Sequence, residues 1–164
     1  MPTKKRLADL NCSLAQALDS VGDWWTLLIV RDLFLGATRF SDIRESLGIA
    51  RNVLATRLVQ LQASGLIERQ GTERRPHYVL TWRGRDLIPA LVALLQWGDK
   101  WVAAEGAPMI VTDEEGRSVA PVAVRNCDGA AVGADSVRFQ PGPGAHQRTR
   151  MYIEMLARAK KVRG

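Results

Sequence analysis

Two short amphipathic segments separated by only a few residues constrain the fold of this 164-residue chain more than any other feature. The first covers residues 41–48, where Ser41 is expected to cap a helix and Gly48 to end it in the left-handed conformation. The second covers residues 51–64 and carries one apolar stripe, formed by Leu54, Leu58 and Leu61. Two short helices joined by a tight turn that contains glycine are typical of a helix-turn-helix.

The next segment of the chain has the pattern of a β-hairpin. Residues 66–70 and 77–80 are predicted strands, and the polar, basic residues 71–76 between them are the predicted tip. Two helices followed by a hairpin form the winged variant of the motif. The expected fold class is therefore mainly α with a small β-hairpin wing, a winged helix-turn-helix.

Further helices are predicted on both sides of this motif. Residues 13–20 favour a short helix, and residues 24–35 are apolar nearly all round, which is typical of a helix in the middle of a core. After the hairpin, Thr81 is expected to cap a long helix over residues 82–104. Pro89 falls inside this helix and should either kink it or mark a delayed start.

The amino-acid composition of the sequence changes after Gly106. Gly and Pro become frequent, and short β-like runs occur at residues 109–112, 119–125 and 137–139. A last helix is predicted over residues 147–162. We therefore expect two domains: residues 1–105, which contain the winged motif, and residues 106–164, a small C-terminal β-rich appendage with a terminal helix.

Positive charge is concentrated on the predicted winged motif. The chain has a net charge of +6, and residues 39–85 alone hold nine arginines, no lysine and four acids. Arginine suits bidentate contacts to phosphate and to guanine. This distribution indicates double-stranded DNA as the partner.

The outward side of the helix at residues 51–64 is the candidate surface for reading bases. Arg51, Asn52, Ala55 and Thr56 are the predicted base contacts, with Gln60 beside them, because the N-terminal part of such a helix reaches the base edges. Contacts to phosphate or the minor groove are predicted for Arg39, Ser41, Arg74, Arg75 and His77. The alternative is a merely solvated polar face. Arg57 flanks the buried stripe and has either a structural or a binding role.

Other classes of protein find little support in the sequence. The longest apolar run, residues 27–30, is too short to cross a bilayer, and the first residues lack a signal peptide's apolar region, so we expect a cytoplasmic protein. Cys12 and Cys127 are far apart and form no CxxC pair, which argues against a zinc site. The two histidines lie near no candidate nucleophile, and no phosphate-binding glycine loop occurs. Neither enzymatic activity nor a cofactor is expected.

Several of these stretches together resemble HxlR-type regulators. The resemblance covers residues 12–105 and is carried by these segments: Cys12 to Leu18, Gly22 to Leu33, Arg39 to Ile43, Val53 to Leu58, Leu61, Gly65 to Ile67, Tyr78 to Thr81 and Gly84. It implies a MarR-like winged helix that works as a homodimer, with terminal helices forming the dimer contact. Two recognition helices would then meet successive major grooves of a pseudo-palindromic operator.

The resemblance also bears on how the protein is controlled. Cys12 matches the N-terminal cysteine of the family, and this resemblance implies a thiol that senses oxidants or electrophiles, as in some members. The alternative is that Cys12 is an inert thiol. The family often has a polar cap where this chain has Ala50. Some relatives carry a cysteine-rich ribbon where this chain has only Cys127, so no metal site is expected. Trp24, Trp25, Trp97 and Trp101 either line a pocket for a small-molecule effector or belong to the core.

The sequence thus predicts a DNA-binding transcription regulator, most simply a repressor. The alternative is a winged helix that serves as a protein-protein interaction adaptor without specific DNA binding, because the fold alone does not fix the function.

Overall fold

The structure is a computed structural model that describes residues 7–162 of the chain. Its internal contacts form two compact units, Ser20–Val122 and a second unit of the described residues before Ser20 and after Val122. Residues 106–122 therefore associate with the helices that precede them. The division into domains 1–105 and 106–164 stays a prediction.

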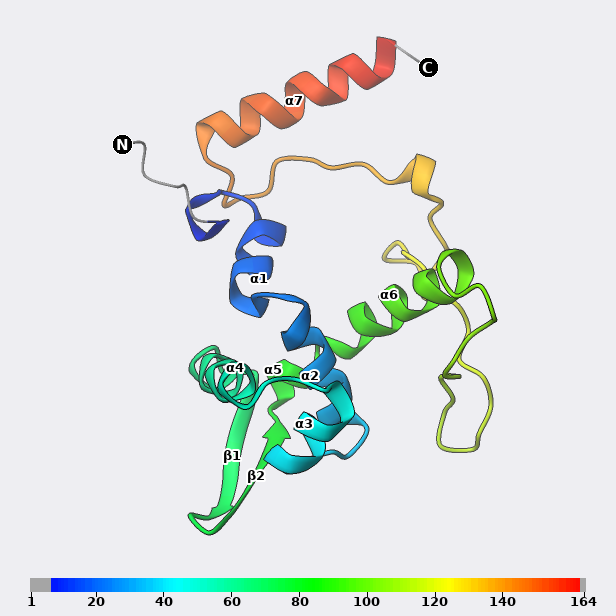
Figure 1. Cartoon of the computed structure of the whole chain (residues 1–164). Coiled ribbons are helices and arrows are strands. Elements are labelled where there is room, and N and C mark those ends of the chain that lie inside the picture. Colours follow the sequence, from blue (N-terminus) through cyan, green and yellow to red (C-terminus); the bar gives the residue numbers. More distant parts are fainter. Residues whose placement is uncertain (1–6, 163–164) are drawn as a thin grey trace. The chain divides into compact units, whose positions relative to one another are not determined.

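The first unit contains the winged motif in the expected order (Figure 1). Its elements are α2 (Trp24–Phe34), α3 (Phe40–Leu47), α4 (Arg51–Ala63), β1 (Ile67–Thr72), β2 (Arg75–Leu80), α5 (Trp82–Arg85) and α6 (Ile88–Trp101). The two strands pair antiparallel, from Ile67 opposite Leu80 to Thr72 opposite Arg75. In Figure 1 this hairpin projects away from the helices of the unit. The winged helix-turn-helix class is confirmed.

A single apolar core holds the helices against the base of the hairpin. The predicted stripe of α4 is confirmed, since Leu54, Leu58 and Leu61 are each at most 2% exposed. They pack with Ile29 and Val30 of α2 and with other buried residues of the unit: Leu33, Ile43, Ile49, Leu66, Ile67 and Leu80. Burying one such side chain stabilises the fold by roughly 1.5–3 kcal/mol. This core fixes the side of α4 that remains exposed.

The helix starts show two side-chain caps, of which the one at Thr81 was predicted above, and one error. Asp23 caps α2 by accepting a hydrogen bond from the Trp25 amide at 3.1 Å, and Thr81 caps α5 through the Gly84 amide at 3.1 Å. The prediction that Ser41 caps α3 is wrong. The chain is extended at Arg39, which occupies the N-cap without a side-chain hydrogen bond, so Ser41 already lies inside the first turn. The Ser41 hydroxyl instead donates to Asp42 Oδ1 at 2.8 Å.

The segment after Thr81 forms two helices where one was predicted. α5 ends at Arg85, and α6 begins at Ile88 with Pro89 in its first turn. Proline is tolerated there because a first-turn amide needs no partner within the helix. Of the two alternatives for Pro89, the delayed start is the correct one.

Gly84 packs close to Leu66, the residue just before β1. A Cβ atom at this position would lie 2.1 Å from the Leu66 carbonyl oxygen, well inside van der Waals contact. The Thr81 hydroxyl strengthens the same junction by donating to the Gly65 carbonyl at 2.7 Å. The base of the wing and the start of α5 are thus packed backbone against backbone.

The expectation that α2 is buried all round is wrong. Its buried side consists of Thr26, Ile29, Val30, Asp32 and Leu33, whereas Trp24 and Phe34 are 70% and 52% exposed. The buried Asp32 carboxylate accepts hydrogen bonds from its neighbour Arg31 through one oxygen, Oδ1. Other apolar residues of α2, such as Leu27 and Leu28, are half-buried.

The segment after α6 folds back along that helix. The Gln96 side-chain amide donates to the Ala120 carbonyl at 3.2 Å and accepts from the Val122 amide at 2.7 Å. These two hydrogen bonds pair with the backbone of the segment in the way that a neighbouring strand does. Between them, Asp113 accepts hydrogen bonds from the Arg117 backbone and side chain, which lower the pKa of this exposed carboxyl.

The second unit contains most of α1 (Ser13–Val21) and the predicted terminal helix α7 (Gln147–Val162), which is confirmed. The Asn11 side chain joins the two ends of the unit, since it donates to the Gly144 carbonyl and accepts from the His146 amide. The predicted β-rich appendage is not confirmed. Between Gly106 and α7, the β pairing found in the described residues consists of two isolated bridges, Thr112 with Ser118 and Arg125 with Ala131.

Candidate nucleic-acid interface

The outward side of α4 displays all five residues that were predicted to read or flank the bases. Arg51, Asn52, Ala55, Thr56 and Gln60 are all exposed, on the part of the helix turned away from its buried leucines. The Thr56 hydroxyl donates to the Asn52 carbonyl at 2.9 Å. Because that bond occupies the hydroxyl hydrogen, Thr56 offers a partner its methyl group and an acceptor oxygen.

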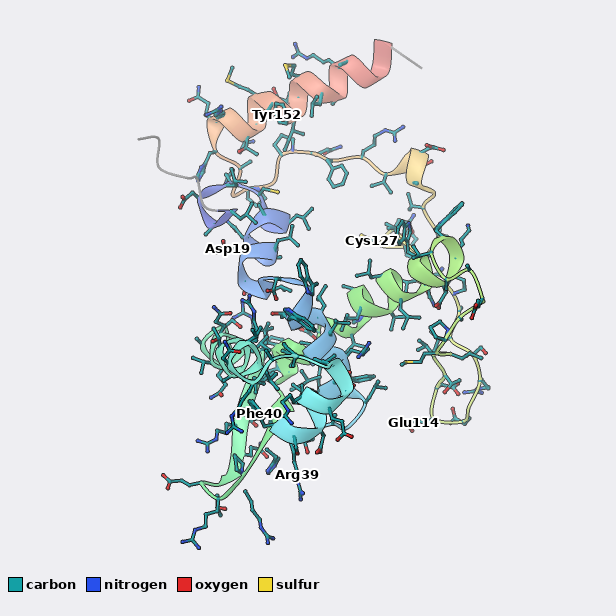
Figure 2. The ribbon with its side chains drawn as sticks, in the orientation of Figure 1. Asp19, Arg39, Phe40, Glu114, Cys127 and Tyr152 are labelled. Carbon is teal, nitrogen blue, oxygen red and sulfur yellow. The ribbon has the colours of Figure 1, made fainter. Side chains whose placement is uncertain are left out.

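Phe40 supports the N-terminal tip of this helix, a role that the sequence analysis missed. The Arg51 guanidinium carbon lies 5.7 Å from the centre of the Phe40 ring, within the range of a cation–π interaction. Phe40 is the first residue of α3, so the two helices of the motif meet at this contact. Figure 2 labels Phe40 together with Arg39 beside it. Arg51 is thereby held at the tip, with its donors still available.

Arg57 has a structural position and does not belong to the exposed face. Its guanidinium pairs with Asp23, the capping residue of α2, and its Nη1 also donates to Gln60 Oε1 at 2.6 Å. The Arg57 Nε atom is buried without a hydrogen-bond partner in the described residues. The hydrogen bond from Arg57 Nη1 occupies the side-chain oxygen of Gln60, so Gln60 offers its amide hydrogens as donors. Of the two roles considered for Arg57, the structure supports the structural one.

The tip of the wing is narrower than predicted. Strand pairing continues to Thr72 and Arg75, so only Glu73 and Arg74 form the turn, and Arg75 and Pro76 belong to β2. The Thr72 hydroxyl accepts a hydrogen bond from the Arg75 amide at 3.3 Å and steadies this turn. Arg74 therefore lies in the turn at the tip of the wing, while Arg75 is the first residue of strand β2.

A hollow of about 400 Å³ separates the wing from the start of α3. It is lined by Thr38, Arg39, Gly71, Thr72, Arg75, Pro76 and His77. The Tyr78 amide donates to the Thr38 carbonyl at 2.8 Å and so fastens β2 to the segment that leads into α3. Three predicted phosphate contacts, Arg39, Arg75 and His77, thus share one hollow. Ser41 is exposed inside α3 but does not line it.

The residues considered for sensing lie elsewhere. Cys12 and Cys127 are both exposed free thiols, and the described residues contain no group of three or more histidine, cysteine or acidic side chains that could hold a metal ion. Trp24, Trp97 and Trp101 are each more than half exposed, so the alternative that they belong to the core of the chain does not hold for these three. Trp25 packs against the core as a partly buried side chain. A ligand pocket formed by these tryptophans stays a prediction.

The helix pair α3–α4, its exposed polar face and the arginine-bearing hairpin together define a winged helix-turn-helix DNA-binding protein. The described residues include no helix that is long and apolar enough to cross a membrane. Comparison with known proteins gives the family. A profile described as HxlR-like helix-turn-helix matches residues 20–106, more than half of the chain, and the chain belongs to this family.

Individual relatives agree with this assignment. An uncharacterised HTH-type transcriptional regulator of Mycobacterium tuberculosis is 39% identical over 137 residues, which cover 80% of this chain and 87% of that protein. A regulator of Synechocystis is 31% identical and matches 64% of this chain and 81% of its own length. The crystal structure of PA1607, a candidate transcription factor, superimposes with a TM-score of 0.77 at 36% identity and covers 84% of this chain and all of that one. A second candidate factor, PA1374 from Pseudomonas aeruginosa, gives 0.62 at 36% identity, covering 86% and 99%. The chain is thus a member of a family of DNA-binding transcription regulators.

Proposed function

We propose that the protein is a sequence-specific regulator, most simply a repressor, that binds a pseudo-palindromic operator as a homodimer. α4 enters the major groove and reads bases through Arg51, Asn52, Ala55 and Thr56, with Gln60 beside them. Arg39, Ser41 and the wing residues Arg74, Arg75 and His77 contact phosphates or the adjacent minor groove. This activity belongs in the cytoplasm, where bacterial DNA lies.

One observation carries the DNA-binding part of the proposal. The four arginines in this set, Arg39, Arg51, Arg74 and Arg75, are exposed, and none of them forms an ion pair within the described part of the chain. By contrast, Arg31, Arg57 and Arg117 are all paired with acids. Arginines left without carboxylates on one side of a winged motif are suited to phosphate, which supplies the missing negative charge.

The homodimer is supported by apolar faces that the single chain leaves uncovered. On α6, Leu94, Trp97 and Trp101 follow one another at helical spacing and are 54%, 56% and 67% exposed. On α1, Leu14 and Leu18 are exposed in the same way. A second copy that buries these side chains would remove them from water and place two copies of α4 for two half-sites.

We propose that the regulator is controlled by a thiol-reactive or small-molecule signal. Cys12 is exposed and lies just before α1, so an oxidant can reach its thiol, and oxidation there would act on the N-terminal part of the dimer. A small-molecule effector is the other signal considered.

The test is selection of bound fragments from genomic DNA, followed by affinity measurements at several salt concentrations. A regulator retains one or a few fragments with a shared inverted repeat, and its affinity falls steeply with salt, as phosphate contacts require. A protein-protein adaptor retains no preferred fragment and shows no such steep dependence. Enrichment without a shared repeat would contradict the symmetric operator.

A further inference from the structure

The hollow between the wing and α3 receives arginine and histidine side chains from two separate elements. Arg39 comes from the segment just before α3, while Arg75 and His77 are alternate residues of β2. Alternate residues of a strand point to the same face of the hairpin. The nearest acids along the chain, Asp42 and Glu73, do not line the hollow. The hollow is therefore open and carries a positively charged arginine on each of two sides, Arg39 and Arg75.

Gly71 keeps the wing side of this hollow in shape. Its φ of +85° lies in the left-handed region, which other residues rarely adopt. A Cβ atom there would lie 2.5 Å from the Arg75 carbonyl oxygen and 3.0 Å from His77 Nδ1. Any side chain at this position would therefore displace the backbone of Arg75 and the ring of His77, and so shift the two side chains that β2 contributes.

The opposite side of the hollow is fixed to the wing by one backbone hydrogen bond. The Tyr78 amide donates to the Thr38 carbonyl at 2.8 Å, immediately before Arg39 in the chain. α3 starts at Arg39 without a side-chain cap, so its first-turn amides add to the positive character of this edge. The spacing between Arg39 and the β2 residues is thus set by the fold before any ligand arrives.

We infer that this hollow holds a single phosphate of the DNA backbone, bound at once by Arg39 from the helix-turn-helix and by Arg75 and His77 from the wing. A phosphate offers several acceptor oxygens to donors that approach from different sides, and guanidinium groups match that geometry. The inference deepens the proposed function and rests on it. Arg74, at the tip of the wing, lies outside the hollow and contacts a different phosphate or the minor groove.

The experiment is a scan of the selected operator in which each phosphate in turn is replaced by an uncharged methylphosphonate. In the wild-type protein, the methylphosphonate that replaces the phosphate bound in the hollow is expected to weaken operator binding on the order of tenfold. The reason is that hydrogen bonds between charged groups are lost at this one position of each half-site. The variants R39Q and R75Q should each bind the unmodified operator more weakly and lose most of the penalty at that same phosphate. The matched control R74Q should retain the full penalty there.

Two further measurements make the outcome decisive. G71A, checked for folding by its melting temperature, should behave like R75Q at this phosphate, because it displaces the same groups without removing a charge. Inorganic phosphate alone, titrated by calorimetry, should bind too weakly to compete with the duplex at millimolar concentration.

The inference is overturned if R39Q and R75Q lose their penalties at different phosphates, or if free phosphate binds tightly and displaces DNA. Either result would leave the regulator assignment intact. If no duplex is bound at all, the proposed function fails together with this inference.

Discussion

Asp23 contacts two helices of the motif with the two oxygens of one carboxylate. Oδ1 accepts the Trp25 amide at 3.1 Å and caps α2, while Oδ2 pairs with the Arg57 guanidinium on α4. The Asp23 and Arg57 side chains are 28% and 26% exposed, so the pair is only partly screened by water. The orientation of the recognition helix is thereby linked to a helix start far away in the sequence.

We predict that D23N and D23A differ in a defined way. Asparagine remains a good cap but loses the charge opposite Arg57, so D23N should lower the free energy of unfolding by about 1 kcal/mol. D23A also loses the cap and should cost about 1 kcal/mol more. Urea denaturation measures both values. Equal stability of D23N and D23A would show that the cap contributes nothing.

The base-reading role of α4 predicts a loss of discrimination. N52A and R51A should each reduce the preference for operator over random DNA on the order of tenfold or more, since a good bidentate contact contributes about 1–3 kcal/mol of selectivity. Competition binding against random duplex measures this ratio. Q62A, an exposed substitution on the same helix and outside the predicted contacts, should leave the ratio unchanged. Equal losses on both kinds of DNA would reduce these residues to general backbone contacts.

The apolar face of α6 predicts a change in assembly. W97E should shift the protein from dimer to monomer in sedimentation, because a charge would be buried in the proposed interface. The affinity for a two-half-site operator should fall as the dimer is lost. W82E is the matched control, since Trp82 is also exposed, at 77%, but lies on α5. A W97E protein that remains dimeric would place the interface elsewhere.

Thiol sensing through Cys12 predicts oxidant-dependent release of DNA. Peroxide or diamide should lower operator binding by the native protein, and C12S should be insensitive while binding normally without oxidant. C127S serves as the control for the second exposed thiol. Release that persists in C12S and is absent in C127S would move the sensor to the other cysteine.

Local patterns in the sequence were sufficient for most of the helix-turn-helix. The spacing of Leu54, Leu58 and Leu61 and the stop at Gly48 depend on neighbours within a few residues, and the structure confirms both. The prediction of a cap at Ser41 was wrong because the residue that caps α3 depends on where the preceding chain turns into the helix, which is at Arg39. The Ser41 hydroxyl is equally able to bond locally, as it does with Asp42.

Long-range relationships could not be predicted in the same way. The sequence shows that Arg57 borders the buried stripe, but only the packed structure brings it to Asp23. Likewise, the convergence of Arg39 with Arg75 and His77 depends on how the hairpin folds back past Thr38. Residues 106–146 contain β-like runs, yet isolated short runs without partner strands cannot form a stable sheet.

The contact at Gly84 has a consequence for how this chain tolerates change. Since even a methyl group would meet the Leu66 carbonyl at 2.1 Å, the space between α5 and the wing excludes every other amino acid. Selection should therefore preserve this glycine as strictly as any DNA-contacting arginine, although it offers no donor, charge or apolar surface of its own. If Gly84 is invariant among relatives, the cause would be the short distance between two backbone segments.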